Sequence, residues 1–249
     1  MSSLSETGHA RNVANFERVV TEINAMGAVY NPSKASIKAA ALNAQLASAK
    51  AALSAVNAAE STYKLSVSSR NFAFVPLSKL VTRINSALKI SDTNSVTIDS
   101  SMTLVRKLQG RRASPKTSKE DLAIAEAAGN KIVEISASRM SYDNRLDNFD
   151  KLIKQLSSIT AYAPNEADLK IAGLMVTYTD LKTKNTAVNT AATNLNIARI
   201  NRNDILYKPL LGIADTSSYA KTYIKSVYGA TSAQFRNVSR QKIKSIVTV

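Results

Sequence analysis

Apolar residues recur every three or four positions along most of the chain, which is the spacing of one face of an α-helix. Residues 10–27 show this clearly and predict a first amphipathic helix, with apolar positions at Val13, Phe16, Val19, Val20, Ile23 and Met26. Gly27 and the segment Tyr30-Asn-Pro predict its end. The next helix is expected to begin near Ser33, because Pro32 suits the first turn of a helix.

Two later segments alternate apolar steps of four and three, the heptad pattern of helices that pack along their length. The first comprises Leu42, Leu46, Ala49, Leu53, Val56, Glu60, Tyr63, Val67, Arg70 and Phe74, and the second Leu174, Tyr178, Leu181, Asn185, Val188, Ala192, Leu195, Arg199, Arg202 and Leu206. We expect two long helices, the second from about Asn165, that end at Pro76 and Pro209. Alanines beside both patterns favour tight packing over an open cavity.

Shorter helices are predicted around them. Their expected ranges are 77–88, 102–108 with Gly110 as the stop, 119–157 opened by a cap at Ser118, 220–228 with Gly229 as the stop, and 232–247. The segment from Arg111 to Ser118 is the best linker candidate.

The chain also repeats itself. Residues 30–71 and 162–203 align without gaps at an offset of 132 and share 13 identical residues, among them Tyr30 with Tyr162 and Arg70 with Arg202. Shorter matches flank this block: 15–20 with 148–153, 76–77 with 209–210, and 105–106 with 235–236. A repeat of this length indicates one supersecondary unit used twice.

Together these patterns predict an all-α fold, an elongated helical bundle of two tandem copies related by a pseudo-twofold axis. Each copy is a long helical hairpin followed by two short helices. The predicted repeats are 1–117 and 118–249, packed as one domain, with equivalent hairpins at 10–75 and 137–208. The low content of glycine (7) and proline (5) agrees with a helical chain.

The repeated blocks resemble a known group of sequences. These are Asn-Phe, Tyr-x-Pro-x-x-Ala, Ala-Val-Asn and Arg-Asn, together with Val227-Tyr-Gly-Ala-Thr-Ser232. They are similar to a group of uncharacterised all-helical proteins of Bacteroidota, especially flavobacteria, and the similarity covers most of the chain. It implies a bacterial origin and a duplicated helical fold, and it supplies no activity, cofactor or catalytic residue.

The chain is basic, with a net charge of +15 that divides into +8 in residues 1–132 and +7 in 133–249. Two acid-free stretches supply candidate polyanion-binding residues: Arg106, Lys107, Arg111, Arg112, Lys221, Lys225, Arg236, Arg240, Lys242 and Lys244. Tyr219, Tyr223 and Tyr228 lie near the second stretch, where they could stack on bases or simply pack on the next helix. The alternative for the charges is a solvated face that serves solubility.

Catalytic chemistry is not indicated. The chain has no cysteine, its single histidine, His9, is expected in a frayed terminus, and no glycine-rich phosphate loop is present. Asp143, Asp147 and Asp150 have the spacing of an acidic helix stripe beside basic residues, which we favour over a metal or acid/base cluster. We predict no catalytic, cofactor or metal site.

Repeat-equivalent polar residues are expected to serve structure. Arg70-Asn71 and Arg202-Asn203 are predicted to pair with a carboxylate across the interface of the copies or to cap a helix end, and two anion sites are the alternative. Asn57 and Asn189 are expected to bond across the hairpin and set its register.

The sequence favours a non-enzymatic structural, assembly or interaction protein that acts through a basic helical surface. Its expected partner is a second copy of the same chain, in a homo-oligomer, or another protein. Sequence-nonspecific nucleic-acid binding is the alternative, and a membrane-active helical component is the third. The first residues show no signal-peptide pattern, and no apolar run is long enough to span a membrane, so we expect a cytoplasmic location. Export by a route that needs no signal peptide would leave the same sequence.

Overall fold

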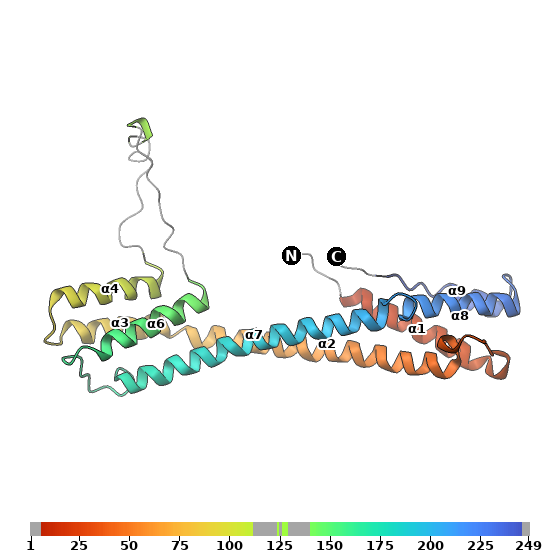
Figure 1. Cartoon of the computed structure of the whole chain (residues 1–249), viewed down its shortest axis with the longest axis horizontal. Coiled ribbons are helices and arrows are strands. Elements are labelled where there is room, and N and C mark those ends of the chain that lie inside the picture. The colour runs from red at the N-terminus through yellow and green to blue at the C-terminus, as the bar shows by residue number, and fades with distance from the viewer. Residues whose placement is uncertain (1–5, 112–123, 125, 129–139, 246–249) are drawn as a thin grey trace. The chain divides into compact units, whose positions relative to one another are not determined.

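The computed structural model describes residues 6–111, 124, 126–128 and 140–245, and every regular element within these ranges is helical. The chain forms two compact units: unit 1 contains residues 1–64 and 191–249, and unit 2 contains residues 65–190. The two long helices, α2 (Ala39–Phe74) and α7 (Ile171–Tyr207), each contribute one segment to each unit (Figure 1).

Unit 1 packs α1 (Glu6–Ala25) against α8 (Ile213–Tyr228) and α9 (Ala233–Ser239). Two short 3₁₀ turns, η1 (Gly27–Val29) and η2 (Ala35–Ile37), connect α1 to α2. The core is apolar and includes Phe16, Ile23, Leu42, Leu206 and Ile224. An amide pair between Asn24 and Asn43 and an ion pair between Glu17 and Lys50 join α1 to α2.

Unit 2 packs α4 (Ser95–Gln109) against both α3 (Leu77–Lys89) and α6 (Tyr142–Ser157), and these three helices lie close together in Figure 1. Its core includes Phe74, Leu77, Leu108, Phe149 and Leu152. The ends of α4 follow local chemistry: the Asn94 side chain caps the first turn, and Gly110 adopts the left-handed conformation that stops the helix.

The predicted heptad positions lie on the packed faces of the long helices. All twenty of them are buried or half-buried, including the polar Asn185 and Arg202. The helices end at Phe74 and Tyr207, shortly before Pro76 and Pro209, as predicted.

Both long helices begin about six residues later than predicted. Before α2, the Tyr30 hydroxyl donates to the Ile37 carbonyl over 2.7 Å, and before α7, the Tyr162 hydroxyl donates to the Leu169 carbonyl over 3.0 Å. Each hydrogen bond joins a buried tyrosine to a carbonyl seven residues later and closes the segment between them into a loop. The proline in each segment therefore lies within a loop and does not start the helix.

Four other predicted helices are wrong in length. Two of them, α4 and α8, begin at Ser95 and Ile213, seven residues earlier than predicted. A single helix over 119–157 does not form, because Met140 is not helical and Ser141 caps the start of α6; the cap predicted at Ser118 lies outside the described residues. The last helix ends at Ser239 and is followed by a non-helical segment over 241–245. That segment is held by side chains of α1, which replace the helical hydrogen bonds of its backbone.

Candidate functional site

The C-terminal segment of unit 1 is fixed to α1 through its backbone. The Asn12 side chain is only 4% exposed, donates to the Lys244 carbonyl over 2.7 Å and accepts from the Lys244 backbone N–H over 3.2 Å. One turn further along, Asn15 donates to the Lys242 carbonyl over 2.7 Å. Because the backbone is held, the exposed side chains of Lys242 and Lys244 project from a defined position.

Five exposed basic residues occupy this part of unit 1, and we call them the C-terminal basic surface: Lys225, Arg236, Arg240, Lys242 and Lys244. None of them forms an ion pair with an acidic residue that the structure describes. The sequence from residue 216 to residue 249 contains no acidic residue. The surface therefore carries uncompensated positive charge.

Lys221 differs in its contacts from the five residues of the C-terminal basic surface. It is half-buried, its ammonium group donates to the Gln241 carbonyl, and burial lowers its pKa. It therefore helps to fix the C-terminal segment through the Gln241 carbonyl.

The nearby tyrosines pack within unit 1. Lys34 Nζ lies 3.4 Å from the centre of the Tyr219 ring, and the Tyr223 ring meets Tyr30 edge-on at 5.2 Å. Tyr219, Tyr223 and Tyr228 all pack against the core. These contacts favour a packing role for the three rings over base stacking.

The other predicted basic cluster lies in unit 2. Lys107 and Arg111 are exposed. Arg106 is half-buried and lines a small cavity of about 190 Å³ together with Gln109 and Asn85. Arg112 lies outside the described residues. Each unit therefore carries described residues of one of the two predicted clusters. The C-terminal cluster has side-chain contacts that hold its backbone in a non-helical form.

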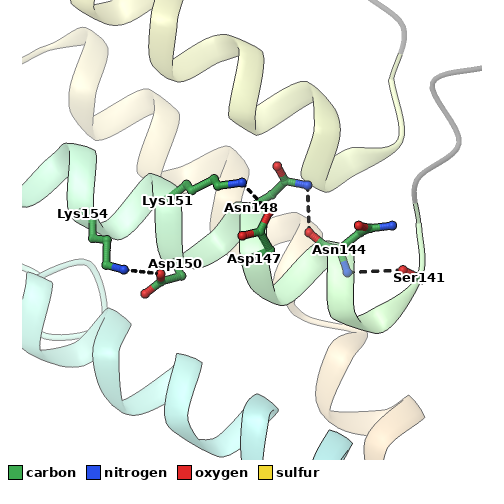
Figure 2. A network of polar contacts seen from close by, with 7 residues as sticks. All are labelled: Ser141, Asn144, Asp147, Asn148, Asp150, Lys151 and Lys154. Carbon is green, nitrogen blue, oxygen red and sulfur yellow. Dashed lines mark hydrogen bonds and ion pairs between the residues drawn. The ribbon is translucent and has the colours of Figure 1, made fainter. Parts of the chain in front are cut away.

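Two of the three carboxylates of the α6 acidic stripe pair with lysines of the same helix, as Figure 2 shows. Asp147 pairs with Lys151 and Asp150 with Lys154, both over 2.6 Å and four residues apart. Asp143 instead accepts a hydrogen bond from the Asn185 amide over 2.7 Å. These contacts favour the structural interpretation of the stripe.

Arg70 meets an amide where a carboxylate was expected. Its guanidinium donates to the Asn185 side-chain oxygen over 3.2 Å and lies 4.0 Å from the centre of the Tyr142 ring. Asn185 relays the contact to Asp143, and the Tyr142 hydroxyl donates to Asn71 over 2.6 Å. Asn185 interrupts an apolar heptad pattern, and that interruption is the sequence signal for a buried polar contact.

The residues that the sequence alignment matches to Arg70 and Asn71 have different contacts. Arg202 is buried in unit 1 and donates to the side chain of its neighbour Asn203. Asn57 and Asn189 are exposed beside the buried Val56 and Val188. The buried amide of the heptad pattern is therefore Asn185, while Asn57 and Asn189 lie on the outer face.

His9 is not in a frayed terminus. It is 2% exposed, and its Nδ1 lies 2.8 Å from the Tyr207 hydroxyl, to which Asn12 also donates over 2.9 Å. His9 precedes Val13 and Phe16 at steps of four and three, so it continues the apolar face of α1. This spacing could have revealed its burial.

An open groove of about 500 Å³ lies between α2 and α7 within unit 1, where tight packing was expected. Its lining is small and uncharged: Ser48, Ala51, Ala52, Ala55, Asn194, Ile197, Ala198, Asn201 and Ile205. No side chain in this lining titrates near neutral pH, so the groove itself offers no acid or base.

In the part of the chain that the structure describes, no three or more histidine and acidic side chains gather to hold a metal ion. Nor does any helix there combine the length and apolarity needed to cross a bilayer. The chain matches no family model, and neither the curated proteins nor the solved structures contain a match.

Proposed function

We propose that this chain is a non-enzymatic interaction protein that binds a polyanionic partner through the C-terminal basic surface. The observation that carries the proposal is the anchoring of residues 241–244 by Asn12, Asn15 and Lys221. This anchoring positions exposed cations without using their charge for internal ion pairs. Clustered cations bind polyanions by releasing the partner's condensed counterions.

Nucleic acid is the polyanion that tests the proposal most directly. The nearby tyrosines are used in packing, so binding would rest on contacts to the phosphate backbone and would show little sequence preference. The affinity for nucleic acid would fall steeply as the salt concentration rises. On duplex DNA, the logarithm of the association constant falls against the logarithm of the salt concentration with a slope of about −0.9 per phosphate neutralised.

The experiment is gel retardation or fluorescence anisotropy with duplex DNA between about 50 and 200 mM salt. The test variant replaces Arg236, Arg240, Lys242 and Lys244 by Gln. Its fold should persist, because Lys242 and Lys244 are held through backbone atoms. The control replaces four exposed lysines elsewhere by Gln and removes the same charge: Lys79, Lys89, Lys170 and Lys208.

We expect the test variant to lose affinity and to reduce the salt slope by about 3 to 4, and the control to change the slope by less than about 1. Equal effects of both variants would show that net charge alone is responsible. Absence of any retardation of the unmodified protein at low salt would refute nucleic acid as the partner.

We also propose that the two repeats are copies of one helical unit. The Tyr30–Ile37 and Tyr162–Leu169 hydrogen bonds support this, because they occur at the same offset of 132 that aligns the sequences. Buried positions of α3 and α8 also match at a constant offset: 77, 81, 84 and 88 with 213, 217, 220 and 224. Bacterial origin, cytoplasmic location and the elongated shape stay predictions.

A further inference from the structure

Each unit contains long-range contacts that join the first half of the sequence to the second. We call residues 6–111 the first half and residues 140–245 the second half. In unit 1, Thr216 of the second half donates to Gln45 of the first over 2.7 Å. In unit 2, Gln155 of the second half donates to Ser100 of the first over 3.0 Å, and Arg83 pairs with Asp168.

Each of the two apolar cores is built from residues of both halves. The core of unit 1 combines residues 13–49 with residues 206–238, and the core of unit 2 combines residues 74–108 with residues 146–181. A half on its own would therefore leave two sets of apolar side chains exposed to water. Each half supplies the surface that the other needs in order to be buried.

From this reciprocal packing we infer that the halves are complementary binding partners and that a second copy of this chain can supply either one. In the resulting dimer, the first half of each copy packs with the second half of the other. Every contact that builds units 1 and 2 is then kept, which makes such an exchange a low-cost route to a dimer. The inference does not depend on polyanion binding or on the duplication.

The covalent connection allows both arrangements by its length. The sequence places 28 residues between Arg111 and Met140, and a chain of that length spans up to roughly 95 Å when extended. Pairing within one chain is favoured in dilute solution, because a covalent connection gives the two halves an effective concentration, which for short linkers is about 1 mM. Exchange is therefore expected when the chain folds at high protein concentration.

Engineered cysteines can distinguish the two arrangements, since the chain has no cysteine of its own. The full chain carrying S100C and Q155C is unfolded in urea, refolded at about 1 μM or at several hundred μM, and separated by size. The first concentration is far below the effective concentration within one chain, and the second approaches it. Each fraction is then treated with a short bismaleimide and examined on a denaturing gel. R83C with D168C is a second pair across the halves.

The matched control is N24C with N43C, two exposed residues in contact within the first half. We expect a dimer fraction that grows at least several-fold with the concentration of refolding. In that fraction the pairs across the halves should give covalent dimers, whereas the control pair should give only single chains.

Two results would overturn the inference. One is the absence of a dimer after refolding of the unmodified chain at the higher concentration. The other is a dimer in which both pairs across the halves crosslink only within a chain, because that dimer would form through a different surface.

Discussion

Replacing Tyr162 by Phe removes one hydroxyl from the loop that precedes α7 and tests whether that loop depends on it. The ring is 6% exposed, and its hydroxyl donates to the Leu169 carbonyl. Phe preserves the ring but leaves this buried carbonyl without its donor. A buried acceptor that loses its partner costs about 1–3 kcal/mol, so we expect the free energy of unfolding to fall by about 1.5 kcal/mol at pH 8.

The pKa of the same hydroxyl predicts how the stability difference between the protein and the Phe variant changes at alkaline pH. Burial, and to a lesser degree the nearby Asp168 and Glu166, raise the pKa of Tyr162 from 10.0 to about 12. The folded state thus holds its proton more tightly than the unfolded state. The corresponding stability is complete below pH 10 and is lost as pH rises from 10 to 12, by about 1.4 kcal/mol at pH 11. The protein and the Phe variant should therefore become about equally stable near pH 11.

The assay is urea unfolding followed by circular dichroism from pH 8 to pH 11. Tyr178→Phe is the control, because Tyr178 is a half-buried residue of α7 in the same unit whose hydroxyl has no hydrogen-bond partner among the described residues. It should change stability by less than about 0.5 kcal/mol at every pH. A loss below that value for Tyr162→Phe, or a difference that stays constant up to pH 11, would refute the reasoning.

Two further substitutions test other local features. Gly173→Ala places a Cβ 2.2 Å from the Ala167 carbonyl oxygen and should cost more than about 2 kcal/mol, whereas Gly27→Ala has open space and only a left-handed backbone, and should cost about 1 kcal/mol in urea unfolding. Similar losses for both would contradict the close approach at Gly173. Asp168→Asn should flatten the fall in melting temperature between pH 5 and pH 3, because the hydrogen bond from Arg83 lowers the pKa of Asp168 and its contribution is lost as pH falls through that pKa. An unchanged acid profile would show that this exposed pair does not affect stability.

Much of the helix content could be predicted from local patterns. The position of α3 and the end of α4 at Gly110 follow from apolar spacing and a glycine stop, which act within one or two helical turns. The start of α4 was missed, because the Asn94 cap was not recognised. Because these signals act only over neighbouring residues, they also explain why the starts of α2 and α7 were predicted wrongly. The spacing before α2 and α7 is compatible with a helix, but Tyr30 and Tyr162 bind carbonyls seven residues ahead and keep those segments as loops.

The candidate site was predictable only in part. Lys242 and Lys244 could be identified from charge, but their anchoring depends on Asn12, more than 200 residues away in sequence. Lys221 belonged to the same basic stretch, yet packing directs its charge to a carbonyl. Clustering of charge is visible in a sequence, whereas the choice between an exposed and a structural role is made by contacts.

The sequence by itself determined that the chain is helical, where its long helices run and which of their faces are buried, because helical periodicity is a property of neighbouring residues. Only the tertiary structure decided which buried faces meet. It placed Phe16 in one core with Leu206 and Phe149 in the other with Phe74. An apolar face specifies burial but not its partner, and the partner is selected by shape and by polar contacts between distant segments.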